Sequence, residues 1–331
     1  MLQRRVRALV LICVCVLHAA CDVQPAPLLR VGTNIWPGYE PLYLARELNY
    51  FSSDEVRLVE FASATQVIRA FRNHAIDAAT LTLDETLLLA QDVPDIRVVT
   101  VMDVSSGADV ILAQRGISTL HDLRGKRVGV EQTALGGYML HRALRHAQLT
   151  SADVQRVYLQ VDEHEHTFLQ GDIDAVVTFD PVRARLLAAG AGLLFDSSQI
   201  AGEIVDVLVV HRAFLAAQPE RVSRLVGAWF RAVAYLEAQP NHAATLMAPR
   251  LGVDARDLLD SYRLIEIPRY AENLEWLGDN GTTRGLVDSA QQLVTFMQQA
   301  GLLRRPVAVE ALPDAGPLRA VSELIAAPGS S

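Results

Sequence analysis

The sequence predicts an α/β protein built of two similar lobes with a cleft between them. Half of the 331 residues are apolar, which is enough to give each lobe its own core. A sparse pattern occurs twice: a glycine lies in a short apolar strand, and an Ile-Asp-Ala opens another strand further on. Gly32 and Asp77 are 45 positions apart (77 − 32), and so are Gly129 and Asp174 (174 − 129). This equal spacing favours a duplicated β-α-β unit over two unrelated units.

The order of the remaining elements predicts two crossings between the lobes. A β-branched run ends the first lobe near Asp103, and Gly107 is a candidate hinge before a strand at 108–112. An apolar strand at 204–210 returns the chain, and the residues from about 219 onward have a helical period. We therefore assign residues 28–104 and 208–305 to lobe 1, residues 105–207 to lobe 2, and residues 306–331 to a C-terminal tail of little functional weight.

The N-terminus has the layout of a secretory signal. Three early arginines precede an uncharged run over residues 8–20, which is shorter than the ~20 residues of a membrane-spanning helix. Two alanines before Cys21 resemble a bacterial lipobox, and Asp22 resembles the signal that retains lipoproteins at the inner membrane. His18 departs from the lipobox, so cleavage to a free periplasmic protein is the alternative. We expect a signal peptide over residues 1–20, a lipidated Cys21 with a linker to residue 27, and a periplasmic protein anchored to the inner membrane.

The charge of the chain argues against nucleic acid as a partner. The formal net charge is −8, and loss of the three signal arginines would make it −11. Affinity for nucleic acid depends on clustered lysines and arginines that neutralise phosphates, and the sequence has no basic run.

The repeat also predicts where a small molecule would bind. Ligands of open α/β sheets bind outside the carboxyl ends of the strands, so the polar residues at those ends should line the cleft from both lobes. In addition, the turn Trp36-Pro37-Gly38-Tyr39 lifts two aromatic rings above the first strand. The candidate ligand-binding residues are Asn34, Trp36, Tyr39, Thr82, Asp84, Asp103, Glu131, Thr133 and Asp180.

Some of these residues have a structural alternative. Asp84 and Asp180 follow strands and precede helical patterns, so each could be a helix N-cap that never contacts a ligand. Trp36 could cap the core, so that of the two rings only Tyr39 is exposed to solvent. Asp77 and Asp174, one strand earlier, we interpret as structural.

Five segments of the chain carry a family resemblance: residues 31–51, 75–84, 122–130, 171–181 and 272–276. They resemble the substrate-binding proteins of nitrate, sulfonate and taurine ABC importers, a group that includes binders of thiamine-pyrimidine precursors. The resemblance implies a type II periplasmic-binding-protein fold, a ligand held between closing lobes, and an ABC permease as the partner. It leaves two alternatives: a sensory module coupled to a membrane signalling partner, and an enzyme similar to a fungal thiamine-pyrimidine synthase.

The residue types in the predicted cleft favour a cationic or donor-rich ligand. Members of this group that bind sulfonate or nitrate hold the anion with hydroxyls and with backbone N–H groups at helix N-termini, and a helix beginning at Thr133 retains one such place. Four of the candidate residues are carboxylates, however, and unpaired carboxylates repel anions. We therefore expect an amine, an amidine-like ring or another donor-rich molecule.

The sequence supplies no convincing metal or catalytic motif. Asp162-Glu163-His164-Glu165-His166 has metal-ligating residue types, but His164 and His166 would face different sides of a helix. Asp162 and Glu165 have the spacing of a capping box that opens this helix. No HExxH, phosphate-binding loop or G-x-S-x-G is present. We expect no metal, no cofactor and no enzymatic activity.

Overall fold

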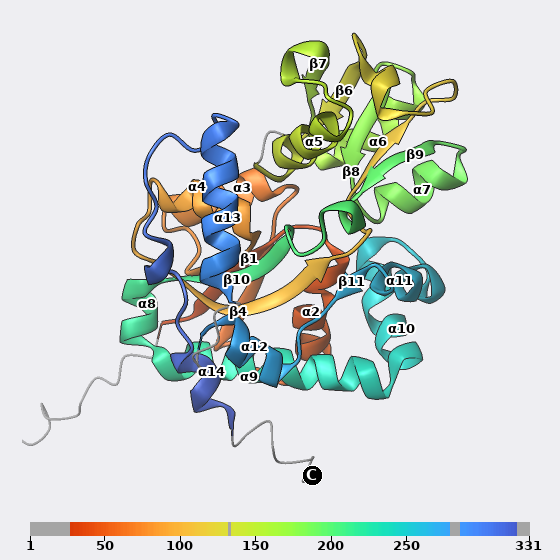
Figure 1. Ribbon diagram of the computed structural model, residues 1–331. Coiled ribbons are helices and arrows are strands. Elements are labelled where there is room, and N and C mark those ends of the chain that lie inside the picture. The colour runs from red at the N-terminus through yellow and green to blue at the C-terminus, as the bar shows by residue number, and fades with distance from the viewer. Residues whose placement is uncertain (1–26, 132–133, 279–284, 323–331) are drawn as a thin grey trace, which may run out of the picture.

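Two β-sheets divide the protein into two α/β lobes, as the sequence predicts (Figure 1). The structure is a computed structural model that describes residues 27–131, 134–278 and 285–322. Cys21, the expected signal peptide and Thr133 lie outside the described residues. The first sheet has the order β11-β4-β10-β3-β1-β2, and the second has the order β7-β6-β8-β5-β9. The strands of the first sheet are β1 (Leu29–Thr33), β2 (Val56–Glu60), β3 (Ala78–Thr82), β4 (Ile96–Ser105), β10 (Val205–His211) and β11 (Ile265–Glu266); those of the second are β5 (Val110–Ala113), β6 (Arg127–Val130), β7 (Gln155–Tyr158), β8 (Ala175–Thr178) and β9 (Gly192–Asp196).

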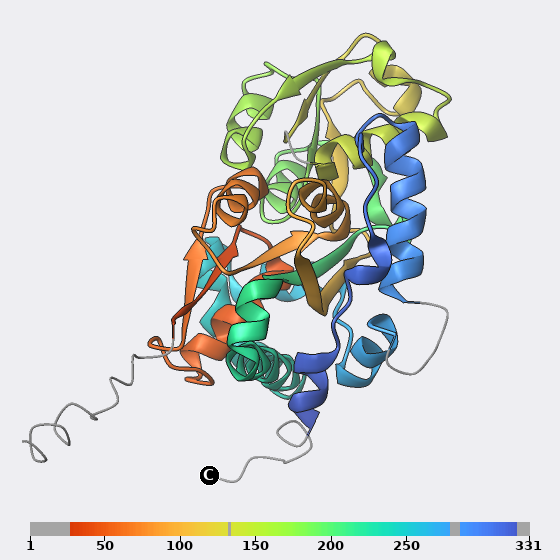
Figure 2. The same ribbon diagram turned by 90° about the vertical axis from the view of Figure 1, so that its left-hand side faces the viewer.

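Helices surround both sheets, and Figure 2 shows the second lobe above the larger first lobe. One long helix, α13 (Leu286–Gln299), stands beside α4 (Leu83–Ala90) of lobe 1 and reaches α5 (Ala134–His146) of lobe 2, where the rings of Phe296 and Tyr138 are 4.8 Å apart. Lobe 1 carries α2 (Glu40–Glu47), α3 (Ala64–Arg72), α4 (Leu83–Ala90), α8 (Arg212–Ala217), α9 (Pro219–Ala238), α10 (Pro240–Leu251), α11 (Ala255–Tyr262), α12 (Tyr270–Trp276), α13 (Leu286–Gln299) and α14 (Gly316–Ala320); lobe 2 carries α5 (Ala134–His146), α6 (Val161–Leu169) and α7 (Val182–Ala188). None of the helices in the described ranges is long and apolar enough to cross a membrane.

The two copies of the sequence repeat have the same local structure. Gly32 of β1 pairs with the second residue of β3, and Gly129 of β6 pairs with the second residue of β8. A Cβ on Gly32 would collide with the side chain of Ile76, and a Cβ on Gly129 would collide with that of Ile173. Glycine at both positions therefore allows the isoleucine to pack closely against the strand.

An arginine–aspartate pair fastens each repeat in the same way. The guanidinium of Arg30 lies 2.8 Å from Asp77 Oδ1, and that of Arg127 lies 3.0 Å from Asp174 Oδ1. In both copies the backbone N–H of the arginine also donates to the same aspartate, at 2.9 and 2.8 Å. Asp77 and Asp174 are therefore structural, as interpreted from the sequence.

The two crossings between the lobes are bonded to each other. After β4, Gly107 adopts a φ of +114°, a conformation that favours glycine, and its N–H donates to Ser197 Oγ at 2.6 Å. Ser197 begins a 3-10 turn (Ser197–Ile200) on the returning crossing, and its hydroxyl is also 2.8 Å from Ser105 Oγ. The chain rejoins the first sheet at Val205, three residues before the boundary expected from the sequence.

The expectation of a C-terminal tail is wrong for its described part. A 3-10 turn (Val309–Ala311) and α14 follow residue 306, and Leu312, Leu318 and Val321 are buried against lobe 1. Val98 of β4 donates its N–H to Leu312 O at 2.7 Å and accepts from Asp314 N at 2.9 Å. The alanine- and proline-rich composition concealed these buried apolar residues, and residues 323–331 lie outside the description.

Candidate ligand-binding cleft

A narrow hollow lies between the lobes and is lined from both. Its volume is about 20 Å³, which accommodates little more than one water molecule. The lobes are thus closed, and a larger ligand requires them to separate. Lobe 1 contributes Asn34, Trp36, Tyr39, Ala64, Thr82, Glu85 and Asp206, and lobe 2 contributes Asp109, Glu131, Leu135 and Phe179.

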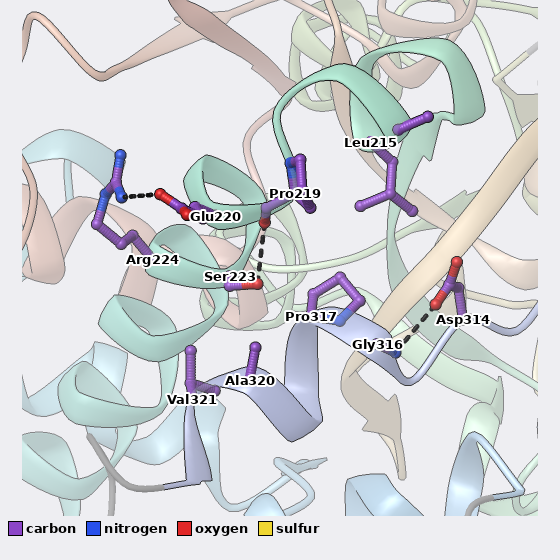
Figure 3. A pocket seen from close by; sticks show the side chains of 11 residues that line it. Leu215, Pro219, Glu220, Ser223, Arg224, Asp314, Gly316, Pro317, Ala320 and Val321 are labelled. Atoms are coloured by element: carbon purple, nitrogen blue, oxygen red, sulfur yellow. Dashed lines mark hydrogen bonds and ion pairs between the residues drawn. The ribbon is translucent and has the colours of Figure 1, made fainter.

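A larger groove of about 690 Å³ lies elsewhere, among α8, α9 and α14 on lobe 1 (Figure 3). Its polar groups are paired locally: Ser223 Oγ donates to Pro219 O at 2.9 Å, and Arg224 lies 3.8 Å from Glu220. The groove therefore lacks the convergent, unpaired polar groups that distinguish a ligand site from a surface depression.

Trp36 joins the two lobes across the cleft. Its indole Nε1–H donates to Asp103 Oδ2 at 3.1 Å, and its ring meets the ring of Phe179 edge-to-face at 5.5 Å and 84°. A Cβ at Gly38 would collide with the Asp103 carboxyl group, so the Pro-Gly turn is what allows the indole to approach that acid. Trp36 is only 4% exposed, and it both closes the core and lines the cleft.

A pair of carboxyl groups lies beneath Trp36 and Tyr39. Asp103 and Asp206 are directly opposite each other on β4 and β10, and the Tyr39 hydroxyl donates to Asp206 Oδ1. Burial raises the pKa of Asp103 to about 7. Burial and the charge of Asp103 also raise the pKa of Asp206 well above its ordinary value. Loss of hydration therefore favours the protonated form of both acids, and a nearby cation would favour their charged form.

Thr82 and Glu85 form a capping box at the start of α4. Thr82 Oγ1 accepts the Glu85 N–H at 3.4 Å, and the Glu85 carboxyl group accepts the Thr82 N–H at 3.2 Å. The N-cap of α4 is therefore Thr82 and not Asp84. Asp84 lies behind the lining; its carboxyl group is fully buried, which raises its pKa to about 6.

Asp180 bonds the first turn of α7 from the position before Pro181, which is the N-cap of that helix. Its Oδ1 accepts the N–H of Ala184 at 3.0 Å, and its Oδ2 lies 3.5 Å from Arg183. These bonds hold the carboxyl group on α7, behind the cleft lining. This geometry favours a structural role for Asp180, although the N-cap itself is Pro181 and not Asp180 as the structural alternative supposed.

The capping box predicted within residues 162–166 needs a correction. Helix α6 begins at Val161, and its capping box pairs Gln160 with Glu163, so the box expected from Asp162 and Glu165 is wrong. Glutamine is a poor N-cap by propensity, which is why the true start was missed. Within the described residues no three metal-ligating side chains converge. His164 is buried at 3.2 Å from Thr178 Oγ1, and burial lowers its pKa to about 4.

Several lining residues were missed from the sequence. Glu85, Asp109, Asp206 and Phe179 were not candidates: Glu85 and Phe179 follow strands of the repeat, whereas Asp109 directly precedes β5 and Asp206 lies at the start of β10. Asp109 stands just before β5, two residues after the hinge glycine, and burial together with the charges of Asp84 and Asp180 raises its pKa to about 7. Its position beside Gly107 was the signal that could have identified it.

Two oxygen atoms in the lining have no partner among the described residues. They are Asn34 Oδ1 and Asp109 Oδ2, on side chains that are 7% and 3% exposed. Four carboxyl groups line the cleft, from Glu85, Asp109, Glu131 and Asp206, and no lysine or arginine of the described chain does so. Buried acceptors of this kind are normally satisfied, so the cleft is chemically suited to a ligand that donates hydrogen bonds.

The chain resembles known proteins over most of its length. Residues 22–249 match the NMT1-like family. The chain belongs to this family. The resemblance to substrate-binding proteins stated from the sequence is thereby confirmed at the level of the family.

Two curated relatives are similar in sequence to this NMT1-like protein. It is 27% identical over 209 residues to the putative aliphatic sulfonates-binding protein of Escherichia coli (strain K12), covering 62% of this chain and 65% of that protein. It is 26% identical over 224 residues to the 4-amino-5-hydroxymethyl-2-methylpyrimidine phosphate synthase of Aspergillus parasiticus, covering 62% and 64%. Both matches span less than two thirds of the relative's own length.

The structural similarity extends further than the sequence similarity. The alkanesulfonate-binding protein from Xanthomonas axonopodis pv. citri, solved with MOPS bound, superposes with a TM-score of 0.73 at 20% identity, over 86% of this chain and 97% of that one. This NMT1-like protein therefore has the two-lobed fold of that binding protein.

Proposed function

We propose that this NMT1-like protein is a periplasmic solute-binding protein that captures a small cationic or donor-rich organic molecule and delivers it to an ABC importer. Relatives named as binding proteins and the shared two-lobed fold support the binding role. The further expectation of a lipid anchor on Cys21, holding the protein beside an inner-membrane permease, is part of the same proposal and rests on the residues around that cysteine.

One observation carries the ligand class: the cleft lining has unpaired buried oxygens and no basic side chain among the described residues. An ammonium or amidinium group would donate to Asn34 Oδ1 and Asp109 Oδ2, and its charge would favour the ionised form of the nearby Asp206. The Trp36 and Phe179 rings would enclose the apolar part of the same molecule. A sulfonate would meet acceptors and negative charge instead.

A thermal-shift screen of the signal-free protein tests this proposal. The panel contains amines, polyamines, amino acids, pyrimidines, sulfonates and nitrate. A ligand at 100 times its Kd stabilises the folded state by about 2.7 kcal/mol. We expect the shift from amines or protonated pyrimidines. A shift from sulfonates or nitrate alone would contradict the ligand class.

The same panel addresses the enzymatic alternative. Incubation of the purified protein with each stabilising compound, followed by mass spectrometry, should return the compound unchanged. Product formation would contradict the binding role.

A further inference from the structure

The N-terminus of α3 faces the cleft from lobe 1, and side-chain oxygens accept the N–H groups of its first three residues. In an α-helix these groups have no partner within the helix and form a natural site for an anion. Ser63 Oγ, the N-cap, accepts the N–H of Gln66 at 3.4 Å. Glu131 accepts two more, from Ala64 and from Thr65, the latter at 3.4 Å. The N–H groups of Ala64, Thr65 and Gln66, the first three residues of the helix, are thus already bonded to side chains.

Glu131 belongs to the opposite lobe. It directly follows β6 of lobe 2, and its Oε1 also accepts the Thr65 hydroxyl at 3.4 Å. The side chain lines the cleft together with Ala64 and is only 6% exposed. A carboxyl group from one lobe thus occupies the position at which a free anion would bridge both lobes.

We propose that Glu131 is a specificity-determining residue that excludes anionic ligands by occupying the anion position at the α3 N-terminus. A tethered carboxyl group competes with a free anion at a high effective concentration, and it adds negative charge to a cleft that already holds three other acids. This inference rests on the proposed function only in taking the cleft as the ligand site. It does not depend on which cation binds.

The occupancy mechanism predicts different behaviour for two substitutions. Glu131→Ala removes the carboxyl group and leaves the Ala64 and Thr65 N–H groups without their acceptor. Glu131→Gln removes the charge but keeps an amide oxygen in the same place, so it is the matched control. Burial raises the pKa of Glu131 to about 7 while the bonds from Thr65 oppose that rise, and in either protonation state the wild-type side chain fills the position.

Calorimetric titration with ethanesulfonate provides the test, at pH 5.5 and at pH 7.5. At the lower pH the neighbouring buried acids carry less charge, which isolates the effect of occupancy. We expect Glu131→Ala to bind ethanesulfonate at least tenfold more tightly than the wild-type protein, and Glu131→Gln to remain within threefold of the wild type. Circular dichroism confirms folding, and Glu131→Ser serves as a second truncation if the alanine variant does not fold.

Three outcomes would overturn the inference: no gain in the truncated variants, an equal gain in Glu131→Gln, or tight ethanesulfonate binding by the wild-type protein. The cation proposal is measured separately, by titration of the wild-type protein with ethylammonium and with the amines of the screen. If the wild-type protein binds no amine, the comparison of ethanesulfonate binding among the Glu131 variants still tests the role of Glu131. If that comparison fails, the amine titration still tests the cation proposal.

Discussion

Asp109→Asn should stabilise the ligand-free protein at alkaline pH. Burial raises the pKa of Asp109 from 3.8 to about 7, chiefly because the charged form loses its hydration. A group whose pKa is raised on folding favours the folded state below its unfolded pKa, and this contribution is lost as the pH rises through the folded value. The interval from 3.8 to about 7 corresponds to about 4 kcal/mol at ~1.36 kcal/mol per pH unit, which sets the upper limit of the gain.

Urea denaturation from pH 4 to pH 8 measures this effect. The wild-type free energy of unfolding should fall more steeply with pH than that of Asp109→Asn, by about 1.4 kcal/mol per pH unit between the two pKa values. The curves should meet near pH 4 and differ by about 2–4 kcal/mol at pH 8. Asp54→Asn, at an exposed position, is the matched control and should leave the curve unchanged. Equal stability of Asp109→Asn and wild type at pH 8 would refute the reasoning.

The other predictions concern binding and location. Trp36→Ala should weaken binding of the ligand found in the screen by about 1–3 kcal/mol without loss of fold, and calorimetry showing unchanged affinity would remove Trp36 from the site. Asp180→Ala should lower the free energy of unfolding by about 1 kcal/mol through loss of its bond to the first turn of α7, with little change in affinity; a tenfold loss of affinity would return Asp180 to the ligand site. Cys21→Ser should release the protein from the membrane fraction, and recovery of the wild-type protein in the periplasmic fraction would count against the lipid anchor.

Sequence periodicity predicted the two sheets because the repeat constrains them locally. Gly32 and Gly129 each meet an isoleucine 44 positions further on, at Ile76 and Ile173, and that constraint appears in the sequence as a spacing. Trp36 was predicted in the cleft for a similar reason, since a Pro-Gly turn after a strand has a limited set of conformations.

The missed residues depend on contacts that no local pattern records. Asp206 lies opposite Asp103 only because an antiparallel strand returns from the second lobe in that register. Glu85 lines the cleft because Thr82, rather than Asp84, begins the helix. The C-terminal segment was missed because Leu312 and Leu318 are buried by partners far away in the sequence.

The bond network at Ser197 has a mechanical consequence for opening of the lobes. One hydroxyl group contacts both Ser105 and Gly107, so the two connecting segments cannot slide past each other without breaking it. Rotation about an axis through this point is the motion that leaves the network intact. Asp109 lines the cleft and donates its backbone N–H to Ser105 Oγ at 3.3 Å, so a ligand that bonded its carboxyl group would contact the cleft at the place where the two connecting segments meet.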